Sequence, residues 1–130
     1  MKNAIFIIAI MAAFTARSQS AIAFDEVSIY REFGHSDFTV MSGDTVIRSY
    51  FDGKDILYFV DAKVVRQVIV LTRREARQEQ RVLDRWNKER YGWHWTGITK
   101  CRITNEDGYI MECRKYDRHN PIPETITQKD

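Results

Sequence analysis

The stretch KCRITNEDGYIMECRK, residues 100–115, decides the fold because it encodes a β-hairpin together with its cross-link. Alternation on both sides of a polar segment predicts two strands joined by a tight turn. A three-residue loop over 106–108 gives Gly108 the left-handed backbone of a bulged turn. Counting outward from this loop places Cys101 opposite Cys113. The turn and the cysteine spacing agree on one register, which predicts a Cys101–Cys113 disulfide.

The same register sets charged side chains of the hairpin against one another. Arg102 falls opposite Glu112, which is a favourable cross-strand pair. Lys100 falls opposite Arg114, and this pair repels unless both side chains turn towards water. His94 and His119 have no metal-ligand spacing relative to the cysteines, so we expect no metal site and no other cofactor.

The chain before this hairpin predicts further strands separated by turns of Gly, Asp and Ser. A helical start is the alternative for residues 64–71, but Val and Ile supply five of these eight residues and favour a strand. The expected strands are residues 27–33, 37–41, 45–51, 56–60, 64–71, 93–104 and 109–116. This spacing predicts an antiparallel sheet of about six or seven strands.

One main α-helix is expected over residues 73–91. Thr72 and Glu75 form the pattern of a capping box at its start, and Gly92 suits its C-terminal cap. Apolar residues that would face the sheet recur at helical spacing: Ala76, Val82, Leu83 and Trp86. The sequence therefore predicts an α+β fold with one compact domain over 24–118 and a flexible tail over 119–130.

The N-terminal residues have the layout of a secretory signal peptide. Lys2 precedes an apolar run of 11 residues over 4–14, and a polar stretch then ends in Ala-Ile-Ala. Such a run is too short to cross a bilayer. We expect cleavage after Ala23, with Ser20 as the second choice, so that residues 1–23 are removed; an uncleaved anchor is the alternative. The mature chain would be periplasmic or secreted, without a transmembrane segment.

Charge is balanced once the leader is removed. Residues 1–23 contain two basic residues and no acid, so the formal net charge falls from +2 to zero. This balance and the export signal argue against nucleic acid as a partner. An anionic surface of another protein would suit a row of cations on one face of the expected helix, although a solvated face is the alternative. That row consists of Arg74, Arg77, Arg81, Arg85 and Lys88.

Aromatic residues follow this helix at Tyr91, Trp93 and Trp95. In a strand that begins at Trp93, both tryptophans share a face with Cys101, and His94 points away. An exposed pair would form a ledge for a sugar, a lipid or a protein partner. A buried pair would belong to the core.

No linear catalytic motif is present, which argues against an enzyme without excluding one. The leading hypothesis is a small exported non-enzymatic binding module acting through a protein–protein surface, of the inhibitor, immunity or envelope-assembly type. One alternative is a small secreted hydrolase or transferase using His35 or His94. The other is a sugar or lipid carrier using the Trp93/Trp95 ledge.

Overall fold

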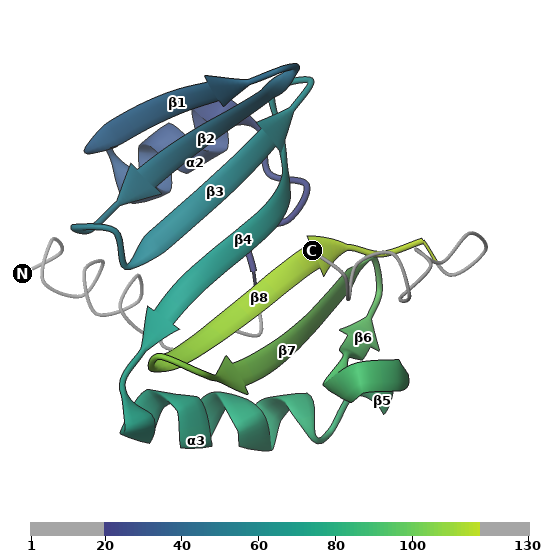
Figure 1. Ribbon diagram of the computed structural model, residues 1–130. Helices are drawn as coiled ribbons and strands as arrows, with labels where there is room; N and C mark the ends of the chain where they lie inside the picture. The colour runs from purple at the N-terminus through teal and green to yellow at the C-terminus, as the bar shows by residue number, and fades with distance from the viewer. Residues whose placement is uncertain (1–19, 118–130) are drawn as a thin grey trace, which may run out of the picture.

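The computed structural model describes residues 20–117, which form one antiparallel sheet with helices (Figure 1). The expected antiparallel sheet is confirmed, but it has eight strands and two α-helices in the described part. The predicted tail over 119–130 lies outside the described residues. The helices are α2 (Glu26–Phe33) and α3 (Arg73–Leu83), and the strands are β1 (Phe38–Ser42), β2 (Thr45–Tyr50), β3 (Asp55–Val60), β4 (Lys63–Leu71), β5 (Asn87–Lys88), β6 (His94–Thr96), β7 (Thr99–Asn105) and β8 (Tyr109–Lys115).

Two meanders meet at the centre of the sheet. Strands β1 to β4 follow one another, and the chain then runs through α3 to β5 at the far edge. From there β6, β7 and β8 fold back inward, so that β8 pairs with β4. This long-range pairing sets Gln67 opposite Cys113 and Arg66 opposite Arg114. The strand order is β1-β2-β3-β4-β8-β7-β6-β5.

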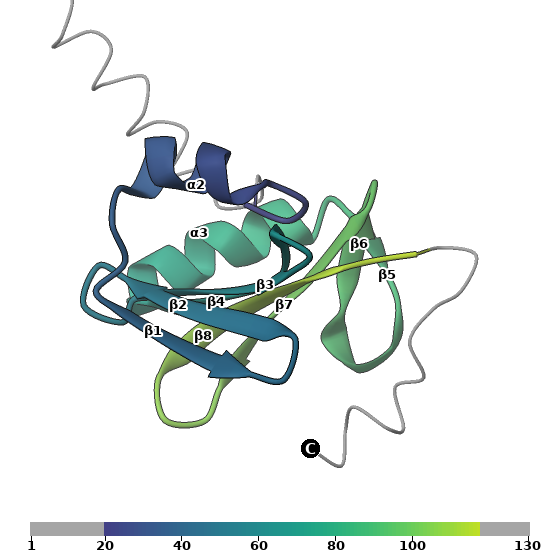
Figure 2. The same cartoon turned by 90° about the horizontal axis from the view of Figure 1, so that it is seen from above.

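Both helices lie on the same side of the sheet, as the view from above shows (Figure 2). The hydrophobic core lies between the helices and the sheet. It includes Ile29 of α2, Leu83 of α3, and Leu57 and Met111 of the sheet. In the part of the chain that the structure describes, neither helix combines the length and the apolar character needed to cross a bilayer. Within residues 20–117, the opposite side of the sheet carries no helix (Figure 2).

The strand predicted over 27–33 is wrong, because this segment forms α2. The Asp25 side chain accepts a hydrogen bond from the Ser28 backbone N–H at 2.8 Å and caps the first turn. Gly34, with a φ of 77°, ends the helix in the left-handed region. Ile29 and Phe33, four residues apart, pack on the core, so the apolar period is helical.

Helix α3 begins as predicted but ends at Leu83 rather than at residue 91. Its capping box is confirmed, with Thr72 and Glu75 bonding each other's backbone N–H groups. Asp84 is the C-terminal cap, and the next residues turn into β5, which pairs with β6. Gly92 instead ends a separate 3-10 turn, η1 (Arg90–Gly92).

The single strand predicted over 93–104 is wrong as well, because Gly97 and Ile98 divide it into β6 and β7. The predicted register of the last hairpin is confirmed: Cys101 lies opposite Cys113, and the two cysteines form a disulfide. The alternative helical start of 64–71 is not adopted, since this segment lies in β4.

Strand β1 forms one edge of the sheet, and all five of its residues are exposed. Phe38 and Met41 are the most exposed, at 65% and 71%. Within residues 20–117 no strand pairs with its outer side. The sheet thus ends in an uncharged, largely apolar strand.

Candidate functional site

On the side of the sheet that carries no helix within residues 20–117, three arginines lie around one carboxylate, and Lys100 lies opposite one of them. Because side chains alternate along a strand, the neighbours of the buried Gln67, Cys101 and Cys113 point to this side. The registers bring residues from β4, β7 and β8 together there. We call this group the basic cluster, and its members are Arg66, Lys100, Arg102, Arg114 and Glu112.

Glu112 is the centre of the basic cluster. Its Oε2 accepts hydrogen bonds from Arg66 Nε at 2.6 Å and Arg114 Nε at 2.8 Å, and Arg102 Nη2 lies 3.8 Å from Oε1. Burial by itself would raise the pKa of Glu112, but the hydrogen bond from Arg114 and the charge of Arg66 outweigh burial. The pKa therefore lies below its ordinary value, and Glu112 is ionised at neutral pH.

Trp93 lies beneath the cations of the basic cluster. Its ring is fully buried, with Arg102 Cζ at 4.4 Å, Lys100 Nζ at 4.8 Å and Arg114 Cζ at 5.2 Å from a ring centroid. Cations over an indole face are attracted by its quadrupole. The buried ring is therefore in contact with three cations of the cluster.

The two tryptophans do not form an exposed ledge. Trp93 is buried, and Trp95 is half-buried with its ring 5.3 Å from that of Tyr116. Trp95 lies opposite Lys100, and His94 lies opposite Cys101, so the predicted sharing of a face with Cys101 is wrong. The turn before β7 reverses the chain and causes this difference. A carrier that stacks its ligand on this ledge finds no open face on Trp93.

The other residues predicted to bind a partner are exposed, but they do not form one helical row. Arg74, Arg77 and Arg81 lie on α3, whereas Arg85 and Lys88 follow its end. Because α3 covers the core side of the sheet, its three arginines and the basic cluster lie on opposite sides of the sheet. Tyr91, in η1, is exposed as well and lies apart from the helix. The residues that the sequence predicted on one helix are therefore divided among α3, the segment after it and η1.

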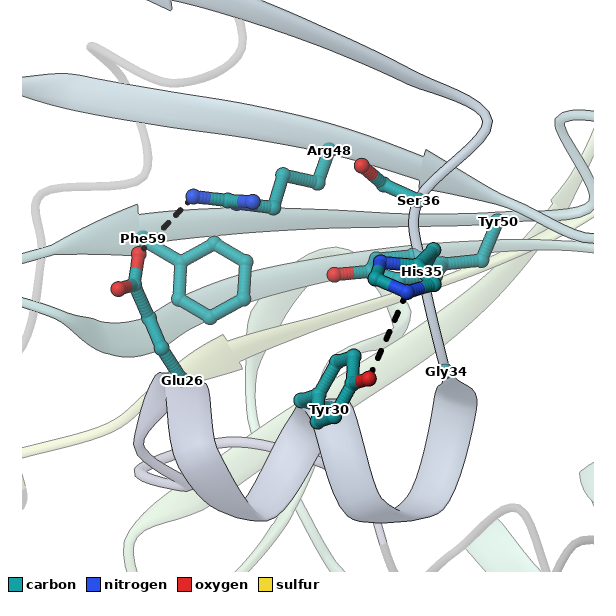
Figure 3. A pocket seen from close by; sticks show the side chains of 8 residues that line it. All are labelled: Glu26, Tyr30, Gly34, His35, Ser36, Arg48, Tyr50 and Phe59. Atoms are coloured by element: carbon teal, nitrogen blue, oxygen red, sulfur yellow. Dashed lines mark hydrogen bonds and ion pairs between the residues drawn. The ribbon is translucent and has the colours of Figure 1, made fainter.

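A cavity of about 250 Å³ lies between α2 and the sheet (Figure 3). Arg48 Nη2 is 3.3 Å from Glu26 Oε1, and this ion pair spans from β2 to α2. His35 Nε2 is 3.4 Å from the Tyr30 hydroxyl. The cavity is lined by Glu26, Tyr30, Gly34, His35, Ser36, Arg48, Tyr50 and Phe59.

The groups in this cavity suit binding of a small polar molecule better than proton transfer. Glu26 is held in place by its ion pair with Arg48. Burial raises the pKa of Tyr50, so its hydroxyl stays protonated. His35 supplies the one imidazole among the lining residues, and it contacts the Tyr30 hydroxyl. His94, the other candidate base, is buried with Nε2 3.6 Å from Asp84 Oδ1 and is not accessible to a substrate.

Sequence reasoning missed both the basic cluster and the cavity. One signal of the cluster was available, since the repelling Lys100–Arg114 pair follows from the hairpin register. Its third strand was not, because the pairing of β4 with β8 joins segments far apart in the chain. Residues 20–117 contain no group of three or more His, Cys, Asp or Glu side chains able to hold a metal ion.

No protein-family model, curated protein or solved structure matches this chain, so its function has to be argued from the arrangement of its own residues.

Proposed function

We propose that this protein is a small exported, non-enzymatic binding module that holds an acidic segment of another protein on its basic cluster. The carrying observation is that three arginines, Arg66, Arg102 and Arg114, share the single carboxylate of Glu112. Arg66, Arg102 and Arg114 keep 39%, 18% and 19% of their side-chain surface exposed, so a partner can reach them. Lys100 is buried and lies over the ring of Trp93.

The hydrogen-bonding state of the arginines supports an anionic partner. The buried Nε of Arg102 has no hydrogen-bond partner within the described residues. This atom is itself closed to solvent, so a partner carboxylate would form its charge-assisted hydrogen bonds with the exposed parts of the three arginine side chains. The arginines of α3 are exposed, so water already satisfies and screens them. We therefore place the partner on the sheet rather than on α3.

Export is part of this proposal and rests on the N-terminal pattern of the sequence. The Cys101–Cys113 disulfide supports it, because disulfides persist mainly in oxidising compartments. The inhibitor, immunity and envelope-assembly types of module all act by holding another protein, and the basic cluster does not distinguish among them.

Binding of a fluorescent decaglutamate peptide at low salt tests the acidic partner. We expect Arg66→Gln with Arg102→Gln to weaken binding at least tenfold, because charge-assisted hydrogen bonds contribute about 1.5–3 kcal/mol each. The matched control is Arg77→Gln with Arg81→Gln, which removes the same charge from α3 and should change affinity less than about twofold. Both variants are checked for an unchanged thermal midpoint.

Two results would contradict this function. If the α3 variant loses affinity and the cluster variant does not, the partner surface is on the helix. If wild-type protein does not hold the peptide even at low salt, the cluster does not recognise acidic polypeptide.

A small hydrolase is the second candidate, because His35 and the carboxylate of Glu26 line the same cavity. In this case we expect turnover of p-nitrophenyl acetate to fall at least a hundredfold in His35→Asn. Free imidazole groups also hydrolyse this ester, so His119→Asn serves as the control for background reactivity. Equal rates in the two variants would remove the hydrolase from consideration.

A further inference from the structure

The residues at the end of the predicted leader are part of the folded body. The backbone N–H of Ala21 donates to Gln67 Oε1 at 3.0 Å. The N–H of Ala23 donates to the Val64 carbonyl at 2.8 Å, and the Val64 N–H donates to the Phe24 carbonyl at 2.9 Å. These bonds fasten the segment to β4, which lies in the middle of the sheet.

The same segment contributes side chains to the core. Ala21 and Ile22 are each 5% exposed and belong to the main hydrophobic cluster. The N–H of Phe24 donates to the Ala21 carbonyl at 3.0 Å, and Ala23 has a φ of 73°, so the chain makes a tight turn here. Cleavage after Ala23, as the sequence alone suggested, would remove both buried side chains and cut this turn.

We infer that the leader is removed at the Ser20–Ala21 peptide bond, and that Ala21 is the first residue of the working protein. Water hydrolyses this bond, leaving a carboxylate on Ser20 and an ammonium group on Ala21. The inference rests on the proposed export. Ser18 and Ser20 provide the small residues at alternate positions that signal cleavage requires.

The surroundings of Ala21 can accept a new chain end. Gln67 Oε1 can accept a hydrogen bond from an ammonium group as well as from an amide N–H. The Gln67 amide donates in turn to Asp55 Oδ1 at 2.9 Å, and Asp55 is buried. A carboxylate thus lies one side chain away from the positive charge that cleavage creates. Every contact of Ala21, Ile22 and Ala23 named above survives a cut at this bond.

The test is the N-terminal sequence and intact mass of the full chain after expression in an exporting bacterial host. We expect exported protein to begin at Ala21. An exported chain that begins at Phe24, or at any other residue, overturns the inference and leaves the proposed export standing. A full-length chain confined to the cytosol contradicts both.

Matched variants identify the bond independently. Asn is too large for the position before a signal cleavage site, and it tolerates the left-handed backbone seen at Ala23. We expect Ser20→Asn to accumulate uncleaved precursor and Ala23→Asn to be processed like wild type. The reverse pattern, or normal processing of Ser20→Asn, would overturn the inference.

A stability comparison separates this inference from the binding proposal. Oxidised protein that begins at Phe24 should unfold at least about 10 °C below protein that begins at Ala21, because it lacks two buried side chains. Equal midpoints would show that the segment is dispensable. This comparison of thermal midpoints does not involve peptide binding, so its result is independent of the binding proposal.

Discussion

Replacing Cys101 and Cys113 by alanine is expected to lower the free energy of unfolding by about 3 kcal/mol. The two residues are 12 positions apart, and the disulfide restricts the unfolded chain by closing that loop. Both are fully buried between β7 and β8, so alanine also leaves unfilled space. For a domain of this size the thermal midpoint should fall by about 12–24 °C, which circular dichroism can follow.

Reduction of the wild-type protein provides the control for this variant. A strong reductant should lower the wild-type midpoint by a similar amount and leave the double-alanine protein unchanged. If the wild-type midpoint does not respond to reductant under conditions that alkylate both thiols, the disulfide does not stabilise the fold.

Glu112→Gln is expected to cost about 3 kcal/mol at neutral pH, a large effect for one atom-for-atom replacement. The neutral amide removes the negative charge that Arg66, Arg102 and Arg114 share. Urea unfolding of both proteins measures the difference. The matched control is Glu26→Gln, which removes the carboxylate from the ion pair with Arg48. The Glu26 side chain is 42% exposed. It should cost less than about 1 kcal/mol.

Acid should reveal the same interaction in the wild-type protein. The pKa of Glu112 is lower in the folded state than its ordinary value of 4.5, so the unfolded chain binds the proton more readily. The stabilisation is fully present above about pH 4.5 and is lost as the pH falls through the folded-state pKa. Glu112→Gln should show a smaller loss over this range. Parallel curves for the two proteins would mean that Glu112 is not held by the arginines.

Local signals predicted the last hairpin and most of the first meander correctly. Turn residues and alternation determine the pairing of two strands that follow each other closely in the chain. These local signals were sufficient to predict the register that places Cys101 opposite Cys113. Segment 27–33 failed because two apolar residues, Val27 and Ile29, suggested a period of two. The cap at Asp25 and the spacing from Ile29 to Phe33 were the stronger signals for a helix.

The candidate sites depended on contacts that local patterns do not contain. The basic cluster needs β4 beside β8, and the cavity needs α2 packed over β2 and β3. The row of cations after Thr72 was overestimated because no strong breaker marks Leu83 as the end of α3. Pairing of the next residues with β6 ended the helix instead, so tertiary structure outweighed local propensity.

Strand β1 is an edge strand whose outer side is unpaired within residues 20–117, which favours association with other molecules at high protein concentration. Natural sheets prevent pairing at their edge strands with lysine, proline or a β-bulge. Strand β1, Phe38–Ser42, contains no charged residue and no proline. An extended backbone from a neighbouring molecule can therefore add there in register, as in the early steps of fibril growth. Self-association through β1 would use five residues at the edge of the sheet that is separated from the arginines of the basic cluster by β2 and β3.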